Sequence, residues 1–138
     1  MGQSYVALYF HLIWTTKKRE RYFSSSGKIR LYDYVKDMVE RKVVELLAIG
    51  GMAEHVHLLV CMKTVDAIAD FMAYIKPASL GFVKRAGKNC DCFSWQKGYA
   101  VFSVSASHVG YLRRYICNQE NHHKIWSFDE ELDFFLNF

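Results

Sequence analysis

The sequence predicts an α+β fold, a ferredoxin-like antiparallel sheet with helices on one face and an appended C-terminal helix. Its 138 residues, 51% of them hydrophobic, suffice for one compact core. A single proline and the lack of Gly/Ser-rich or like-charged blocks leave no linker, so we expect one domain over residues 1–138. The apolar patterns run strand, helix, strand, strand, helix, strand, then a helix, which is the split βαβ plan. This plan would leave the opposite face of the sheet open for a ligand.

Apolar periodicity defines the first four expected elements. Residues 5–14 alternate two mostly apolar sets, which is typical of a central strand. Apolar positions recur at helical spacing over residues 28–47, which predicts an amphipathic helix. Residues 48–51 and 56–62 are short and apolar, so we expect two strands joined by a tight turn near residues 51–54.

The next elements have weaker signals. Residues 65–83 have a helical pattern in which Pro77 should kink the helix or start a new turn. Residues 93–95 and 100–105 look like a hairpin around residues 97–98.

Two helices should close the chain. Ser107 suits the N-cap of a helix that continues to about Asn121, and a short helix is expected over residues 129–136. At about 100° per residue, the first of them carries two separate stripes. The polar stripe is His108, Tyr111, Tyr115, Gln119 and His122, and the apolar stripe is Val109, Leu112 and Ile116. The apolar stripe would dock the helix and leave the polar stripe facing a site.

Two groups of residues are candidates for chemistry. His55 and His57 are two apart on a predicted strand, so both rings project from one face and can hold one cation, while Val56 points away. Tyr115 and Gln119 are i and i+4 on a helix, so they can reach one point in space. The simpler interpretations are polar residues on a part-exposed strand and a tyrosine that only packs.

Charge and composition limit the partners and the compartment. The net charge is +4 and the pI is near 8.9. The basic clusters are Lys17, Lys18, Arg19 and Arg21, then Lys84, Arg85 and Lys88, then Arg113 and Arg114. Nearby aromatic residues complete a mixture suited to unpaired nucleotides, although each cluster could equally be a solvated surface. No apolar run reaches membrane-spanning length, and the cysteines Cys61, Cys90, Cys92 and Cys117 form no CxxC pair, so we expect a soluble, cytoplasmic protein with reduced, packing cysteines.

Five segments in order carry a resemblance to a known family. They are YFHLIWTTK (residues 9–17), EHVHLLV (54–60), FSWQKGY (93–99), FSVS (102–105) and YICNQENHH (115–123). Together they cover nearly the whole chain. The sequence resembles the single-tyrosine HUH transposases of the smallest prokaryotic insertion sequences and their REP-associated relatives.

The resemblance implies roles by position. Tyr115, on the appended helix, matches the catalytic nucleophile, His55 and His57 match the two metal-binding histidines, and Gln119 matches the third metal ligand. The metal would be divalent, Mg²⁺ or Mn²⁺, although zinc would bind such nitrogens more tightly. Glu54 departs from the aspartate common in relatives, which puts any supporting role of that side chain in doubt.

The implied activity is cutting and rejoining single-stranded DNA through a 5′-phosphotyrosine link. The implied partners are a single-stranded DNA hairpin and a second subunit in a homodimer, with the tyrosine supplied in cis or in trans. Lys17, Lys18, Arg19, Arg113 and Arg114 are the expected DNA-facing set, and the last two could also favour the phenolate. His11 matches a first-strand histidine frequent in relatives, with packing as its simpler role.

Two other functions compete with this one. A non-catalytic ferredoxin-like nucleic-acid-binding module would explain the basic and aromatic clusters but not the histidines in register with Tyr115 and Gln119. A zinc hydrolase would need an acid or base beside the metal and would make no use of the tyrosine.

Overall fold

Four strands form one antiparallel sheet in the order β2-β3-β1-β4, as the split βαβ plan requires. The computed structural model describes residues 2–3, 5–42, 44–63, 68–86 and 93–137. The strands are β1 (Leu8–Thr15), β2 (Val44–Met52), β3 (His55–Met62) and β4 (Ala100–Val104). The predicted α+β class and the predicted order of elements are therefore confirmed.

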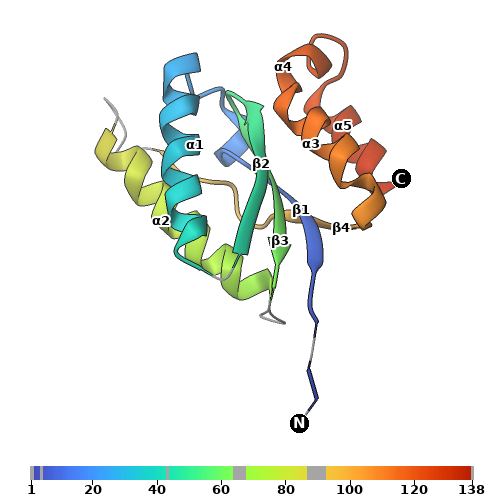
Figure 1. Ribbon diagram of the computed structural model, residues 1–138. Helices are drawn as coiled ribbons and strands as arrows, with labels where there is room; N and C mark the ends of the chain where they lie inside the picture. The colour runs from blue at the N-terminus through green and yellow to red at the C-terminus, as the bar shows by residue number, and fades with distance from the viewer. Residues whose placement is uncertain (1, 4, 43, 64–67, 87–92, 138) are drawn as a thin grey trace.

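Helices cover both faces of this sheet. They are α1 (Ser25–Glu40), α2 (Ile68–Ala86), α3 (Val109–Cys117), α4 (Gln119–His122) and α5 (Phe128–Leu136). Figure 1 shows α1 and α2 on one side of the sheet and α3, α4 and α5 on the other. The expectation of an open second face was wrong, because the C-terminal helices fold back onto it.

Strand alternation divides the buried residues between these two faces. On β1 and β3, Leu12, Trp14, Val56 and Leu58 join the larger apolar core, which lies under α1 and α2. Their strand neighbours point the other way, and Leu59 packs there in a smaller core with residues of α3. The second face is thus only partly apolar.

The long first helix of the sequence prediction ends early. α1 starts at Ser25, where the side chain of Ser24 accepts a hydrogen bond from the backbone N–H of Gly27 at 3.0 Å, and it stops at Glu40. Residues 44–47 belong to β2 instead, where they pair with β3. Their apolar spacing fits both periods, and pairing with β3 decides in favour of the strand.

Two other local predictions were wrong. Residues 93–95 form no strand: only Trp95 makes an isolated bridge, with Thr16, so β4 has no hairpin partner there and pairs with β1. Asn118, with φ −112° and ψ 28°, divides the expected helix over residues 107–121 into α3 and α4, preceded by a 3₁₀ turn, η3 (Ala106–His108). α2 runs through Pro77.

The last helix is set by its own cap. The Ser127 side chain accepts from the backbone N–H of Glu130, and the Glu130 carboxylate accepts from the backbone N–H of Ser127, which is a capping box. α5 therefore starts at Phe128, close to its predicted start. In the part of the chain that is described, no helix is long and apolar enough to cross a membrane.

Candidate metal and tyrosine site

The face of the sheet under α3 and α5 carries both candidate histidines. His55 and His57 lie on β3, and both are fully buried. Gly50 of β2 and Ile13 of β1 flank His57 across the sheet. Because Gly50 has no side chain, the helix above can come close: a Cβ there would lie 2.1 Å from the carbonyl oxygen of Ile116.

A neighbour holds the Nδ1 atom of each histidine. Glu54 lies 2.9 Å from His55 Nδ1, and Arg21 forms an ion pair with the same carboxylate. His11 Nε2 lies 2.7 Å from His57 Nδ1. With Nδ1 engaged, both rings present Nε2 to the centre of the site, the arrangement seen when an outer partner orients a metal-binding histidine. Glu54 thus reaches the site despite its departure from the usual aspartate.

Tyr115 and Gln119 come to the same place from the helices above. Leu112 and Ile116 dock α3 on the sheet, and the Tyr115 ring centroid lies 6.4 Å from that of His57. Gln119 begins α4, just after the break at Asn118, and its Oε1 lies 3.0 Å from His55 Nε2. The four residues that the sequence predicts at the metal and the tyrosine are therefore brought together, with Tyr115 and Gln119 on two helices rather than one.

Glu131 of α5 lies at the centre of this cluster and was missed in the sequence. It is fully buried, and its Oε1 lies 2.9 Å from His57 Nε2 and 3.4 Å from His55 Nε2. Its Oε2 accepts hydrogen bonds from the Tyr115 hydroxyl at 2.5 Å and from Gln119 Nε2 at 2.9 Å. A signal did exist: Glu131 lies among Phe128, Leu132 and Phe135, so one carboxylate interrupts the apolar stripe of the last helix.

His123 is a second residue that the sequence reasoning missed. It follows α4, and its Nε2 lies 3.1 Å from Gln119 Oε1 and 3.3 Å from Glu131 Oε1. His123 therefore holds the Gln119 and Glu131 oxygens in place, and its ring packs against that of His55, with centroids 4.8 Å apart.

Burial and hydrogen bonding oppose each other in the electrostatics of the cluster. Burial alone would raise the pKa of the Glu131 carboxyl, but hydrogen bonds from His123, His55 and His57 outweigh it and hold the pKa below its usual range. Burial lowers the pKa of His57 to about 4, so this ring is neutral at pH 7, the form that binds metal. Burial, and then the bond to Glu131, raise the pKa of the Tyr115 phenol, which stays protonated in this state.

The donor set fits a divalent ion. His55, His57 and Glu131 offer ligand atoms that all lie within 4.8 Å of one another. Ligands at roughly 2.0–2.2 Å from a shared ion lie about 3 Å apart when adjacent, and the separations of 2.9, 3.0 and 3.4 Å match this. Two imidazole nitrogens, one carboxylate oxygen and the Gln119 amide oxygen are suitable ligands for such an ion.

The predicted DNA-facing residues lie on the surface around this site. Lys17, Lys18 and Arg19 form a 3₁₀ turn, η1 (Lys17–Arg19), directly after β1, and Arg113 and Arg114 lie on α3. All five are exposed. Arg19 forms an ion pair with Asp129 and lies 4.8 Å from the centre of the Phe128 ring, so it contacts α5. The hydroxyl of Tyr115 has Glu131 as its partner, not Arg113 or Arg114.

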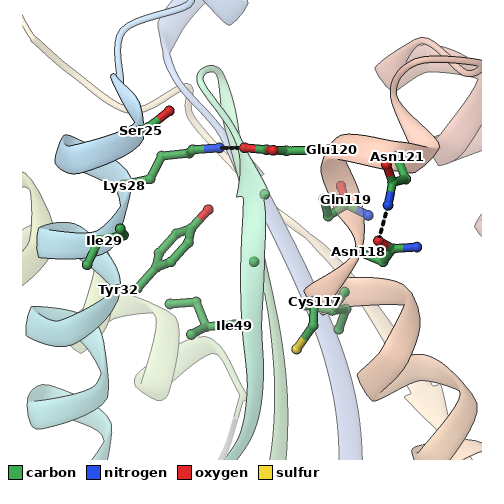
Figure 2. Close-up of a pocket in the computed structure, with 13 residues that line it drawn as sticks. Ser25, Lys28, Ile29, Tyr32, Ile49, Cys117, Asn118, Gln119, Glu120 and Asn121 are labelled. Carbon is green, nitrogen blue, oxygen red and sulfur yellow. Dashed lines mark hydrogen bonds and ion pairs between the residues drawn. The ribbon is translucent and has the colours of Figure 1, made fainter.

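A cleft of about 370 Å³ leads to the edge of the cluster. Figure 2 shows it between α1 and the α3–α4 pair, across the edge strand β2, with Lys28 and Glu120 joined over it at 2.9 Å. Gln119 lines the cleft and also contacts His55, so the cleft borders the buried cluster around His55, His57 and Glu131. Cys117 also lines it and is exposed, so the prediction of a packing role holds only for the buried Cys61. Cys90, Cys92 and Lys88 lie outside the described residues.

Comparisons with known proteins define the class. Residues 4–119 match the model of the IS200-like transposase family, which covers most of the chain. The chain therefore belongs to the IS200-like, single-tyrosine transposases, which cut and rejoin DNA. The matched residues include His55, His57, Tyr115 and Gln119 but stop before Glu131.

Individual relatives agree with this membership. The chain is 28% identical over 126 residues to the ISDra2 transposase TnpA of Deinococcus radiodurans, covering 87% of this chain and 90% of the relative. A crystal structure of a Deinococcus radiodurans protein assigned as a transposase has a TM-score of 0.68 and 30% identity, over 88% of this chain and 95% of that one. A REP-associated tyrosine transposase bound to a REP hairpin has the same fold, with a TM-score of 0.65 and 14% identity, over 89% and 73% of the chains.

Proposed function

We propose that this transposase is a metal-dependent single-stranded DNA endonuclease and strand transferase with Tyr115 as its nucleophile. One observation carries the proposal: the Tyr115 hydroxyl, two imidazole nitrogens and two side-chain oxygens meet in one buried cluster. A buried tyrosine that served only for packing would need some hydrogen-bond partner for its hydroxyl, but not a carboxylate shared with two histidines.

His55, His57 and Gln119 would hold the metal, with Glu131 as a fourth ligand. A bound Mg²⁺ or Mn²⁺ would supply positive charge against the negative charge that accumulates on the scissile phosphate. Glu54 and His11 orient the two histidine rings for this task through their Nδ1 atoms.

The chain's own groups account for the proton and the covalent bond. The Tyr115 oxygen attacks phosphorus, forming a new phosphorus–oxygen bond while the bond to the 3′ oxygen breaks. The phenol proton passes to the Glu131 carboxylate, which already accepts its hydrogen bond, and the departing 3′ oxygen takes a proton from solvent. The product is a 5′-phosphotyrosine link and a free 3′ hydroxyl.

This link makes rejoining possible without ATP. The phosphoryl group stays in an ester bond to Tyr115, so another 3′ hydroxyl can attack it and release the phenol. Two such exchanges move a single strand from one site to another, which is the chemistry that DNA transposition needs.

The expected substrate is a single-stranded DNA hairpin, bound by a homodimer. The exposed basic residues at η1 and α3 support the DNA part of this proposal, and a structural relative is bound to a REP hairpin. DNA contacts would come from Lys17, Lys18, Arg113 and Arg114, with Arg19 contributing once it leaves Asp129.

One observation favours a second candidate. Glu131 beside the histidines is the acid or base that a metal-dependent hydrolase would need, so water rather than Tyr115 could attack the phosphate. A hydrolase would release free ends and leave no protein on the DNA.

A single assay separates these functions. The protein is incubated with end-labelled single-stranded hairpin DNA and Mn²⁺, then resolved on a denaturing gel. A covalent protein–DNA band supports the proposed transferase, cleavage without that band supports the hydrolase, and binding without cleavage supports a non-catalytic module. The same reaction in EDTA should show neither product.

A further inference from the structure

A second cavity lies between β4, α3 and α5, and one of its lining residues, Phe135, packs against the Tyr115 ring. Its volume is about 490 Å³, within the roughly 300–1,000 Å³ typical of ligand sites. Aromatic rings dominate its walls: Phe102 of β4, Tyr111 of α3, and Phe134 and Phe135 of α5. Ser103 and Ser105 add hydroxyls, and none of the described residues that line the cavity carries a carboxylate.

This cavity shares a wall with the site of chemistry. Phe135 packs edge-on against the Tyr115 ring, with centroids 5.4 Å apart, and against His11 at 4.6 Å. His11 also lines the cavity, and its ring is stacked 5.0 Å from that of His57. A group in the cavity would therefore lie one side chain away from both the nucleophile and a proposed metal ligand.

His11 has a buried polar atom with nothing to bind. The residue is fully buried, its Nε2 is engaged by His57, and its Nδ1 has no hydrogen-bond partner among the described residues. A buried polar atom without a partner costs stability, which suggests that something else completes it.

The hydrogen-bond chain fixes what His11 would offer when metal is bound. If His57 gives its Nε2 lone pair to the metal, its proton lies on Nδ1 and is donated to His11 Nε2. His11 Nε2 accepts this hydrogen bond and therefore carries no proton, so the single proton of the His11 ring lies on Nδ1. His11 then presents an N–H donor that needs an acceptor.

We propose that this cavity binds one unpaired nucleobase of the substrate strand, next to the scissile phosphate. The base stacks on the aromatic walls, and one of its carbonyl oxygens or ring nitrogens accepts the hydrogen bond from His11 Nδ1. The inference rests on the proposed function, because it takes single-stranded DNA as the substrate. It adds a base-binding site to the phosphate chemistry.

Photocrosslinking tests where the base lies. A short single-stranded oligonucleotide of bromodeoxyuridine is bound to the wild-type protein with Mg²⁺, irradiated, and the crosslinked peptides are mapped by mass spectrometry. Crosslinks to Tyr111, Phe102 or Phe135 are expected. Crosslinks confined to other surfaces, such as the Lys28 cleft, would overturn the proposal.

Affinity measurements test the base dependence. Fluorescence anisotropy gives Kd for an oligothymidine and for an abasic strand of equal length, with wild type, Tyr111→Ala and the control Tyr99→Ala. Tyr111 and Tyr99 are 48% and 40% exposed, so neither change should unfold the protein, and only Tyr111 lines the cavity. In wild type the abasic strand should bind more weakly, so the Kd of the abasic strand divided by that of the oligothymidine is greater than one. This ratio should fall about ten-fold in Tyr111→Ala and stay unchanged in Tyr99→Ala.

The remaining outcomes are also decisive. An equal ratio in all three proteins would mean that the cavity holds solvent only, and loss of dimers in Tyr111→Ala would mean that a second copy of the chain covers it; either result overturns the base site. The covalent adduct is measured in parallel. An adduct without base dependence leaves the proposed function intact, whereas ring crosslinks without any adduct retain the base site and reject Tyr115 as nucleophile.

Discussion

The two faces of the sheet are built from the same strands but do different work. Under α1 and α2, every second residue of β1 and β3 is apolar, and Leu12, Val56 and Leu58 lie in a continuous core. Under α3 and α5, the alternate positions hold His11, His55 and His57, and the helices add further polar groups. One face stabilises the fold and the other concentrates chemistry.

The difference shows how the protein can bury so many polar groups. Burying a polar group without a partner is costly, so each member of the cluster needs several partners. Glu131 supplies most of them, because its two oxygens contact Tyr115, Gln119, His55 and His57. The opposite face needs no such partners, because its buried side chains on β1 and β3 are apolar.

The largest expected effect is at Tyr115, the proposed nucleophile. Tyr115→Phe should remove the covalent adduct completely while hairpin binding stays within a few-fold of wild type, because only the phenolic oxygen is lost. Loss of the hydrogen bond to Glu131 should cost roughly 1–3 kcal/mol of stability, since a charged acceptor is left with one partner fewer. Denaturing gels and urea unfolding measure the two effects. An adduct that survives would exclude Tyr115 as nucleophile.

The neighbours His57 and Leu58 test the division of labour directly, because both are fully buried and point to opposite faces. Leu58→Ala should cost about 2–5 kcal/mol of unfolding free energy, with Mn²⁺ affinity of the folded protein little changed. His57→Ala should lower Mn²⁺ affinity by more than the roughly 10–100-fold that loss of an outer partner causes.

Urea unfolding in EDTA and calorimetric Mn²⁺ titration provide these values. The comparison fails if Leu58→Ala abolishes metal binding at temperatures where the protein is folded, or if His57→Ala binds Mn²⁺ as wild type does.

The same contrast explains what the sequence could predict. The spacing of apolar residues indicates which face of a strand or helix packs in the core. The order of elements was therefore predicted correctly, as was the placement of His55 and His57 on one face of β3 and Val56 on the other. The roles predicted for His55, His57, Tyr115 and Gln119 came from the resemblance to a known family, because periodicity alone is equally consistent with packing roles. Glu131 was missed because a carboxylate in a short C-terminal helix acquires meaning only when that helix folds back across the sheet. The end of α1 was missed because strand pairing outweighs local helical spacing.

A smaller effect is expected at Gln119. Gln119→Ala should weaken metal-dependent cleavage, and excess Mn²⁺ should partly restore it, because two imidazoles and Glu131 can still hold the ion. Glu120→Ala is the matched control, since the adjacent side chain is exposed and contacts Lys28 instead. Cleavage rates over a Mn²⁺ series measure the rescue. Undiminished cleavage in EDTA would show that the metal site is wrongly assigned.

Salt dependence should separate the basic residues of the two faces. For single strands the slope of log K against log salt is about 0.7 per contacted phosphate, so Lys17→Ala and Arg113→Ala should each reduce it by roughly that amount. Lys42→Ala is the control, because Lys42 lies over Tyr74 on the α1–α2 side. Arg19→Ala should change the slope less, since Arg19 is paired with Asp129. An unchanged slope in every variant would remove these residues from the DNA-binding surface.

The smallest expected effect is no recovery of activity when two inactive variants are mixed. This experiment tests whether Tyr115 acts with the histidines of its own chain or with those of the partner subunit. In this structure Tyr115 packs against His57 of the same chain, and α3 follows β4 after only the short η3 turn. Gly110 weakens the first turn of α3 by roughly 1 kcal/mol relative to alanine, so tertiary contacts decide where the helix docks.

If α3 docks in cis, mixing His57→Ala with Tyr115→Phe restores no adduct, because each site in a heterodimer lacks one of these two residues. If it docks in trans, up to about half of the sites in each heterodimer are intact, and the adduct returns. The mixture is co-refolded, with a tag on one subunit to show that heterodimers have formed, and adducts are then counted on a denaturing gel. Recovery in proven heterodimers would show that α3 crosses to the partner for this step, so that the apolar face is built within one chain and the chemical face between two.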